Sequence, residues 1–386
     1  MPWKETGVVD LREEFVLRSL VEGQGFAPLC REYGVSPKTG YKWRKRFIAD
    51  GRRGLEDDSR RPHSSPRQLG EEQICRLVLL KLAHRGWGPL KIFDLYRRIY
   101  GETRGFCLST VKRVFGKAGL IEPRRRRRHD ECGRIESSVP VEEPNDLWTV
   151  DFKGEWYSSD KRRVEPLTVR DAFSRYVFCT EPLGKGSTKV VKPKFEELFM
   201  EYGVPRAIRS DNGPPFASMR SPRGLTRLSA WWVALGIVLD RITPGHPQEN
   251  GAHERMHRDI AMEVEGTVDG DFRTQVEVLE MWRENFNRVR PHEALGMRVP
   301  AEVYVKSSRR YEEGVFELEY PPEYLRRRVS RTGAIGIDSI QINISLAVAG
   351  WEIGLKPTGC GEYGVWFGPI YLGQVDTTNR VFKAAR

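Results

Sequence analysis

The sequence predicts a multidomain protein, with all-α helix–turn–helix units at the N-terminus, a central α/β domain and a small C-terminal β-barrel. Helical periodicity with basic helices dominates residues 8–119, strands and helices alternate over residues 147–287, and short strands rich in glycine follow Pro321. The length of 386 residues allows several domains of about 100–200 residues each. A mean hydropathy of −0.54 excludes a membrane-embedded chain.

The positive charge of the chain is concentrated in its first third. The whole sequence has a net charge of +11, but residues 1–140 hold 30 basic and 18 acidic side chains, and the remainder is close to neutral. A local excess of this size favours a polyanionic partner such as nucleic acid, because phosphate neutralisation releases counterions. The alternative is a basic surface that only keeps the protein soluble.

The six cysteines are scattered and form no C-x-x-C pair. This pattern predicts reduced thiols, with neither a disulfide framework nor a zinc knuckle. No continuous apolar segment near the first residues resembles a secretory signal. We therefore expect a cytoplasmic protein.

The first unit, residues 1–57, has the order of a helix–turn–helix. Residues 26–33 form a short helical pattern, Gly34 begins a turn, and Ser36 and Pro37 are good starting residues for a second helix over residues 38–47. An ordinary helical hairpin is the alternative. If the second helix reads DNA, its contacts come from Lys38, Lys42, Arg44, Lys45 and Arg46.

A linker over residues 51–67 leads to a second helix–turn–helix unit, residues 66–122. A helical pattern starts at Glu71 and puts Ile74, Leu77, Val78 and Leu82 on one face. Another covers residues 89–100, and Ser109 precedes a last basic helix over residues 110–117 that carries Lys112 and Arg113. A basic linker follows over residues 123–144. It contains a run of five arginines that is either a solvated segment or a tether along DNA: Arg124, Arg125, Arg126, Arg127 and Arg128.

The central domain, residues 145–305, begins with three successive strands and continues with alternating helices and strands. The expected strands cover residues 147–156, 163–170, 176–181, 206–210 and 237–241. The expected helices cover residues 188–202 and 225–235, a long segment from about Gln248, and residues 272–287.

The last domain, residues 321–386, has short strands separated by glycines, which is typical of a small β-barrel. The expected strands include residues 340–344, 351–355, 365–367 and 371–375. Its aromatic side chains would fill the barrel. Contact with DNA or with another subunit is the alternative.

Three acidic residues are candidates for a metal site. Asp151 interrupts an apolar strand, Asp211 follows a strand, and Glu254 lies early in the helix that must pack beside the sheet. Converging carboxylates repel one another unless a cation lies between them, and Mg²⁺ or Mn²⁺ suits an all-oxygen set. Each residue alone has a simpler explanation, since Asp-Asn-Gly is a common turn and Glu254 could be an ordinary surface residue.

Five ordered segments resemble the integrase core of bacterial insertion-sequence transposases, in the DDE superfamily that includes retroviral integrases. They read WTVDFKGEW, LTVRDAFSRYV, IRSDNGPPF, PGHPQENGAHERMHRDI and FNRVRPHEALGMRVPAEVY. The resemblance implies an RNase-H-like fold for the central domain. It places the three catalytic and metal-binding acids on Asp151, Asp211 and Glu254, and the extra length between the last two on a loop insertion at residues 218–228.

The resemblance also implies the reaction. Two divalent cations, Mg²⁺ or Mn²⁺, would support cleavage at the transposon ends and transfer of the freed 3′-hydroxyl to target DNA. The implied partners are terminal inverted repeats, a target duplex and at least a second copy of the chain, in the bacterial nucleoid. Supporting roles fall on Asn212 and Gly213 in a mobile loop, and on His257 and Arg258 one turn after Glu254. Asp171 is interpreted as structural.

Three other functions deserve comparison. His253, Glu254 and His257 match the H-E-x-x-H signature of zinc proteases, but that reading leaves Asp151, Asp211 and the basic first third unexplained. An RNase-H-like nuclease without strand transfer would not need two helix–turn–helix units. A catalytically inactive, sequence-specific DNA-binding protein would not need three intact acids.

Overall fold

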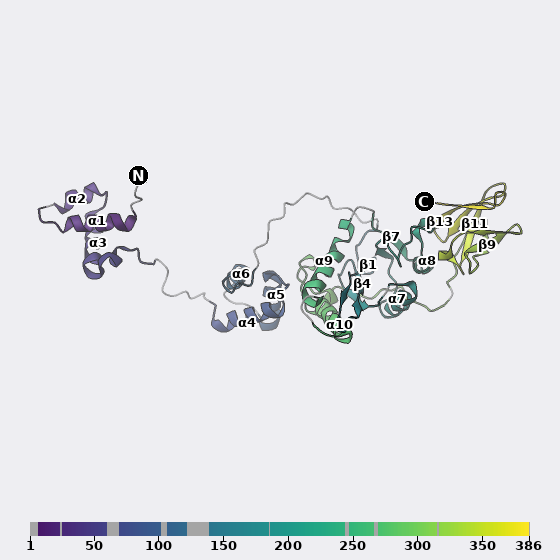
Figure 1. Cartoon of the computed structure of the whole chain (residues 1–386), viewed down its shortest axis with the longest axis horizontal. Coiled ribbons are helices and arrows are strands. Elements are labelled where there is room, and N and C mark those ends of the chain that lie inside the picture. The colour runs from purple at the N-terminus through teal and green to yellow at the C-terminus, as the bar shows by residue number, and fades with distance from the viewer. Residues whose placement is uncertain are drawn as a thin grey trace. The chain divides into compact units, whose positions relative to one another are not determined.

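The computed structural model describes residues 7–23, 25–59, 69–101, 106–121, 139–184, 186–243, 247–265, 269–314 and 316–385. The chain divides into two compact units, Met1–Gln68 and Leu69–Arg386 (Figure 1). Among the described residues, no helix is both long enough and apolar enough to cross a bilayer.

The first unit is a small helical domain built around α3 (Pro37–Asp50), with α1 (Val8–Ser19), α2 (Phe26–Glu32) and the 3₁₀ turn η1 (Gly51–Leu55). The side chain of Ser36 accepts a hydrogen bond from the Thr39 amide, so the predicted cap of α3 is confirmed. The predicted linker starts too early at residue 51, because Leu55 is fully buried in this domain. The core contains Phe15, Val16, Leu29, Cys30, Trp43 and Leu55.

The second helical region consists of α4 (Glu71–Ala83), α5 (Pro89–Tyr100) and α6 (Leu108–Lys117). All three agree with the predicted helices, although α6 starts after Cys107 and two residues before the expected position. Their shared core includes Leu77, Trp87, Ile92, Val111 and Phe115. The run Arg124–Arg128 lies outside the described residues.

The central sheet has five strands in the order β5-β4-β1-β6-β7. The first three strands are antiparallel neighbours, whereas β6 runs parallel to both β1 and β7. The predicted first strand is shorter than expected: β1 ends at Phe152, and β2 (Trp156–Tyr157) pairs with β3 (Arg163–Val164) in a separate ribbon. The sheet strands are β1 (Leu147–Phe152), β4 (Pro166–Asp171), β5 (Val177–Pro182), β6 (Ala207–Ser210) and β7 (Val238–Arg241).

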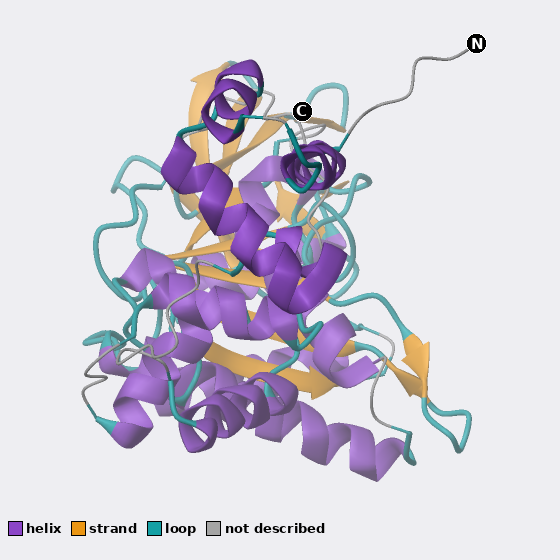
Figure 2. Ribbon diagram, turned by 90° about the vertical axis from the view of Figure 1, so that its left-hand side faces the viewer, coloured by secondary structure: helices purple, strands orange, loops and turns teal. Residues whose placement is uncertain are grey.

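Helices cover this sheet, and Figure 2 distinguishes them from the strands by colour. α7 (Thr188–Tyr202) and α8 (Arg227–Ala234) pack on the face that carries Trp148 and Val150. α10 (Phe272–Arg288) and α9 (Gly251–Ile260) share a second core with Val177 of β5.

The long helix expected from Gln248 has three parts. A 3₁₀ turn, η3 (Pro247–Asn250), leads into α9, and a π-helical turn, η4 (Ala261–Glu265), continues it. Shorter 3₁₀ turns complete the core: η2 (Pro222–Gly224), η5 (Glu293–Leu295) and η6 (Pro300–Glu302).

The C-terminal strands form two open sheets. The larger has the order β14-β13-β12-β11-β8, and β9 pairs only with β10. The predicted closed barrel is not confirmed, because no hydrogen-bonded strand joins β14 to β8 within the described residues. Side chains from both sheets instead fill one core, which includes Val329, Ile335, Ile342, Ile353 and Phe367. The bounds are β8 (Leu325–Arg328), β9 (Ala334–Ile337), β10 (Ile340–Asn343), η7 (Leu346–Val348), β11 (Glu352–Gly359), β12 (Glu362–Phe367), β13 (Ile370–Asp376) and β14 (Val381–Ala384).

The polar segment over residues 218–228 connects the central domain to these sheets. The Ser221 and Ser345 hydroxyls are 2.9 Å apart, and the Arg227 side chain donates to the carbonyl of Leu346 at 3.3 Å. The segment predicted as a loop insertion therefore contacts the C-terminal domain, and its last residues begin α8.

Candidate active site

Asp151 and Asp211 lie at the same end of the central sheet. β1 and β6 are parallel, and Thr149 lies opposite Arg209. Both acids are two residues further along their strands, so the shared register carries them to the same edge. The sequence could not supply this register, which depends on pairing between segments 60 residues apart.

Glu254 reaches this edge because α9 is attached to the sheet by polar contacts. The Arg170 guanidinium donates to the carbonyl of Ala252 at 3.0 Å, and the Arg209 guanidinium donates to the carbonyl of Glu249 at 3.0 Å. The side-chain amide of Asn250 donates to the Asp151 carboxylate at 3.2 Å. The side chain of Glu254 is exposed and makes no hydrogen bond or ion pair with any described residue.

The electrostatics of the site are those of crowded carboxylates. Burial raises the pKa of Asp151 to about 7, and the negative charges of Asp211 and Glu254 add to the rise. The Phe152 backbone and the Asn250 amide oppose the rise, because they favour the charged carboxylate. Burial also raises the pKa of Asp211, and a hydrogen bond from the Gly213 amide opposes it.

The donor set fits a hard divalent cation. Atom Oδ1 of Asp211 is buried and has no hydrogen-bond partner, so one carboxylate oxygen lacks the interaction that a cation would supply. Among the described residues, no three His, Cys, Asp or Glu side chains are arranged to hold one ion together. Asp151 and Asp211 share the sheet edge, and the exposed Glu254 lies near enough for its charge to act on Asp151.

The loop after β6 is held at two points. The Asn212 amide donates to the carbonyl of Ile242 at 2.7 Å, which joins the ends of β6 and β7. A side chain at Gly213 would place its Cβ 2.8 Å from the Asp211 carboxylate, so any larger residue here would force the Asp211 side chain to move. The mobility predicted for this loop stays a prediction.

The two histidines of the H-E-x-x-H match face the sheet. His253 is 1% exposed, and the Nε2 atoms of His253 and His257 each lie 2.7 Å from the Thr168 hydroxyl. Burial lowers the pKa of His253 well below its usual value and lowers that of His257 to about 4. Both imidazoles are bonded to a threonine, which argues against a zinc-protease site. Arg258 is exposed.

Sequence reasoning missed Asn250 and Thr168 as site residues. Thr168 lies directly opposite Asp151 in the β1–β4 pair and is fully buried. A hydroxyl at an alternate position of a buried strand was the available signal. Asp171 is buried and accepts hydrogen bonds from the Asn145 amide and from Ser174, which fits its interpretation as a structural residue.

Comparisons with known proteins agree with this geometry. Two integrase core domain models match residues 141–247 and 235–300. A helix-turn-helix domain model matches residues 11–63, and a homeodomain-like domain model matches residues 39–115. The N-terminal helix–turn–helix regions and the central RNase-H-like integrase core are thus supported.

The chain is similar to two bacterial insertion-element proteins. It is 29% identical to the uncharacterized 39.2 kDa protein of insertion element IS476 from Xanthomonas euvesicatoria, over 64% of this chain and 69% of the relative. It is 29% identical to the uncharacterized 31.7 kDa protein of IS407 from Burkholderia multivorans, over 61% and 82%. The two integrase core matches and these insertion-element relatives together support a DDE integrase-like insertion-sequence transposase. It acts in DNA transposition and integration as a polynucleotidyl transferase, and its family uses divalent metal.

Among solved structures, the catalytic core domain of BIV integrase is 23% identical to the transposase. The match covers 42% of this chain and 93% of that one, with a TM-score of 0.32.

The predicted DNA-contact residues of the transposase differ in their availability. Lys38, Lys42 and Lys45 on α3 are exposed, and so are Lys112 and Arg113 on α6. Arg44 is half-buried beside the ring of Phe26. Arg46 is engaged within the domain: it pairs with Asp58 at 3.0 Å, donates to the carbonyl of Glu56 and lies over the ring of Trp43.

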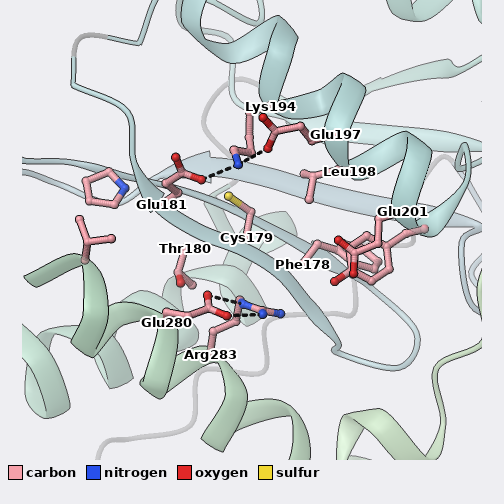
Figure 3. Close-up of a pocket in the computed structure, with 13 residues that line it drawn as sticks. Phe178, Cys179, Thr180, Glu181, Lys194, Glu197, Leu198, Glu201, Glu280 and Arg283 are labelled. Carbon is pink, nitrogen blue, oxygen red and sulfur yellow. Dashed lines mark hydrogen bonds and ion pairs between the residues drawn. The ribbon is translucent and has the colours of Figure 1, made fainter. Parts of the chain in front are cut away.

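A pocket of about 270 Å³ lies elsewhere, between β5, α7 and α10 (Figure 3). Lys194 pairs with both Glu181 and Glu197 on one side of it, and Glu280 pairs with Arg283 on the other. It contains none of the predicted site residues. Its lining residues are Phe178, Cys179, Thr180, Glu181, Pro182, Lys194, Glu197, Leu198, Glu201, Tyr202, Val276, Glu280 and Arg283.

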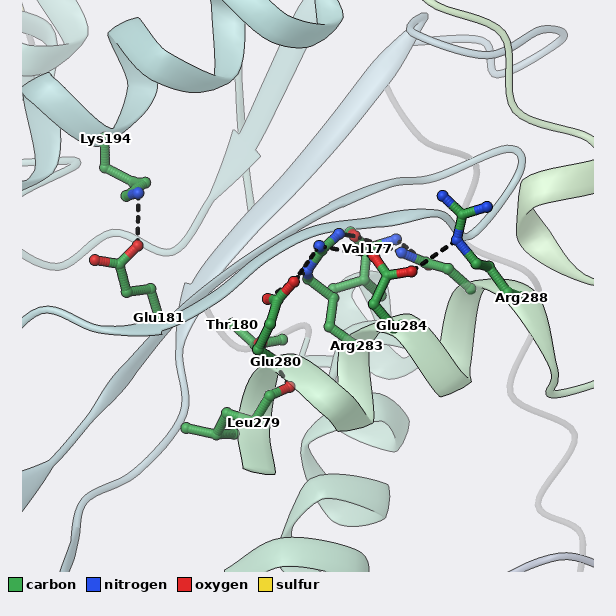
Figure 4. Close-up of polar contacts among 10 residues, drawn as sticks. Val177, Thr180, Glu181, Lys194, Leu279, Glu280, Arg283, Glu284 and Arg288 are labelled. Atoms are coloured by element: carbon green, nitrogen blue, oxygen red, sulfur yellow. Dashed lines mark hydrogen bonds and ion pairs between the residues drawn. The ribbon is translucent and has the colours of Figure 1, made fainter. Parts of the chain in front are cut away.

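Polar contacts from α10 cover the outer edge of β5 beside this pocket (Figure 4). The Thr180 hydroxyl donates to the carbonyl of Leu279 at 3.2 Å. The Asn287 side chain accepts from the Val177 amide and donates to the Val177 carbonyl, both at 2.8 Å. The strand edge is therefore protected from pairing with another strand.

Proposed function

We propose that this transposase cuts DNA at the ends of its insertion sequence and joins the freed 3′-hydroxyl to a target duplex, with Asp151, Asp211 and Glu254 as its catalytic and metal-binding residues. The observation that carries the proposal is the shared sheet edge of Asp151 and Asp211, with the unbonded Oδ1 of Asp211 buried beside them. Two divalent cations bound there would polarise the reacting phosphate.

The chain's own residues do the positioning. The parallel pairing of β1 and β6 fixes Asp151 and Asp211 on a rigid sheet, while α9 supplies Glu254 from its first turn. The Asn250 hydrogen bond favours the ionised form of Asp151, which is the form that can bind a cation. Asn212 ties the loop to the end of β7, and Gly213 leaves room for the Asp211 carboxylate. His257 would support α9 against the sheet through its contact with Thr168, and the exposed Arg258 would contact DNA phosphate.

The DNA partners follow from the two helical regions. The exposed lysines of α3 and the exposed Lys112 and Arg113 of α6 are suited to phosphate contacts at the terminal repeats. The run Arg124–Arg128 adds a basic segment between these helices and the central domain. Joining two ends requires two active sites, so we propose a dimer or higher assembly on DNA, at the nucleoid.

The test uses the full chain with duplexes that carry the terminal repeats of its element. Asp151→Asn is expected to reduce both cleavage and joining by more than about 100-fold, because losing a metal ligand should cost more than losing a residue that only supports a ligand. Binding to the transposon ends should stay within about twofold of the wild type. Glu196→Gln removes a surface carboxylate from α7 and serves as the matched control. Full activity of Asp151→Asn would refute the proposed site. Metal-dependent cleavage without joining would instead indicate a nuclease.

A further inference from the structure

Two threonines lie on the same face of the sheet as Asp151. Thr149 precedes Asp151 by two residues on β1, and Thr168 lies opposite Asp151 on β4. Thr149 is 5% exposed and Thr168 is fully buried. A buried hydroxyl must be hydrogen-bonded to avoid a desolvation penalty, so both positions need polar partners.

Every hydrogen-bonding position of the Thr168 hydroxyl is occupied. It donates its one hydrogen to the main-chain carbonyl of Asp151 at 2.9 Å. Its two lone pairs then accept from Nε2 of His253 and Nε2 of His257, each at 2.7 Å. With the Thr168 hydrogen on the Asp151 carbonyl, both imidazoles carry a hydrogen on Nε2.

Counting donors and acceptors in the same way gives the direction of the hydrogen bond that Thr149 makes. His253 is buried, and its Nδ1 lies 2.9 Å from the Thr149 hydroxyl. A neutral ring with its hydrogen on Nε2 has an acceptor at Nδ1, so Thr149 donates there. The hydrogen bonds thus run in one direction, from Thr149 to His253, from His253 to Thr168, and from Thr168 to the carbonyl of Asp151. Each donor in this network has one acceptor.

This network determines where α9 sits. His253 and His257 lie one residue before and three residues after Glu254, and both converge on one oxygen atom of β4. Two contacts on one helix face fix both its rotation and its position along the sheet. Glu254 has no contact of this kind within the described part of the chain, so its backbone position depends on its neighbours.

We propose that Thr168 is a positioning residue, whose hydroxyl acts through His253 and His257 to place Glu254 relative to Asp151 for binding a divalent cation. The inference rests on the proposed function, because it assigns Glu254 to the cation site. It assigns Thr168 no contact with the cation or with DNA.

The test compares four variants of the full chain. Thr168→Val removes the hydroxyl and keeps the shape of the side chain, and Thr168→Ser restores a hydroxyl. Thr180→Val is the matched control, because Thr180 is the buried cross-strand neighbour of Thr168 and, among the described residues, its hydroxyl bonds only to the Leu279 carbonyl. Thr149→Val removes the other hydroxyl of the network and replaces Thr168→Val if that variant does not fold.

The first measurement is the ¹⁵N chemical shift of the histidine rings in metal-free protein. Wild type, Thr168→Ser and Thr180→Val should show the Nε2–H tautomer at positions 253 and 257. Thr168→Val should shift the His257 signals away from that pattern. A wild-type protein with hydrogens on Nδ1, or a Thr168→Val spectrum identical to that of the wild type, would overturn the proposal.

The second measurement is calorimetric binding of Mn²⁺ to the same proteins. Thr168→Val should weaken binding about 10–100-fold, the range for outer contacts of metal sites, whereas Thr168→Ser and Thr180→Val should stay within about threefold of the wild type. Thr149→Val should weaken binding in the same direction. Unchanged binding in Thr168→Val refutes the inference, whereas unchanged binding in Asp151→Asn refutes the proposed function itself.

Discussion

The side-chain amide of Asn250 donates a hydrogen bond to the carboxylate of Asp151 across 3.2 Å. Asn250 is buried at the end of the 3₁₀ turn η3, four residues before Glu254. One side chain therefore connects the acid on β1 to the segment that carries the acid on α9. It also favours the ionised form of a carboxyl whose burial favours the neutral form.

Replacing this amide should change the pH dependence of catalysis. In Asn250→Ala, the pKa of Asp151 should rise by about one unit above its value of about 7, because a hydrogen bond to a charged group contributes about 1.5–3 kcal/mol. Cleavage at pH 7 should fall about fivefold, because the ionised fraction of Asp151 drops from about one half to about one tenth, and the acid limb of the rate profile should move to higher pH. An acid limb at the wild-type position would contradict this role for Asn250.

The stability of the metal-free protein should fall as the pH rises. The pKa of Asp151 is about 7 in the folded chain and 3.8 in the reference state, so folding favours its protonated form. This contribution is complete below pH 3.8 and is lost as the pH rises through about 7, with a span of up to about 4 kcal/mol. Urea unfolding at a series of pH values measures it, and Asp151→Asn should remove the part of the dependence that is centred near pH 7.

The same proton opposes cation binding. Below pH 7, a cation must displace the proton of Asp151, so Mg²⁺ affinity should increase by up to about tenfold per pH unit and level off above pH 7. Calorimetry in two buffers with different ionisation enthalpies measures both the affinity and the protons released. Affinity that is constant from pH 5 to pH 7 would contradict the assignment of Asp151 as a ligand.

The basic side chains of α3 should contribute unequally to DNA binding. Lys45→Ala removes an exposed lysine and should lower the slope of log affinity against log salt by about one, with little effect on folding. Arg46→Ala removes a side chain bound to Asp58 and Trp43, so it should cost about 1 kcal/mol of stability and change the slope less. Fluorescence anisotropy on a terminal-repeat duplex provides the slopes. Equal slope changes would show that Arg46 leaves its internal partners to contact DNA.

Asn287 should be required for stability. Asn287→Leu leaves the amide of Val177 without a partner and leaves its carbonyl with only the 3.4 Å hydrogen bond from Arg283, at a cost of about 1–3 kcal/mol, and it uncovers the edge of β5. Asn287→Asp keeps an acceptor for the amide but repels the carbonyl, so its loss should be intermediate. Urea unfolding measures the stabilities, and size-exclusion chromatography should show aggregation of Asn287→Leu first. A stable, monodisperse Asn287→Leu would contradict this role.

Much of the fold could be predicted because local signals agree with the final structure. Ser36 and Pro37 begin α3 as expected, and apolar periodicity identifies the helices of the second helical region, α4 to α6. The strand around Asp151 was also evident, because an acid between apolar residues has few explanations. These features depend on neighbours within a few positions along the chain.

The rest depends on contacts between distant segments. A closed C-terminal barrel would require β14 to pair with β8. The two strands do not pair, and nothing in the sequence of either strand indicates this. Leu55 is an isolated apolar residue in a polar segment, and only the helices around it make it part of a core. Thr168 and Asn250 acquire their significance from the β1–β4 register and from the docking of α9, which lie beyond local sequence.

Alternation along β1 has a consequence for how errors arise in this fold. Trp148 and Val150 point into the apolar core, while Thr149 and Asp151 point to the polar side. A register shift of one residue in β1 would bury the Asp151 carboxylate in the apolar core and expose the Trp148 indole to water. Both changes are unfavourable. The register that buries the core residues of β1 is therefore the same register that places Asp151 in the site. A molecule that folds with the wrong register loses both the core packing and the active site.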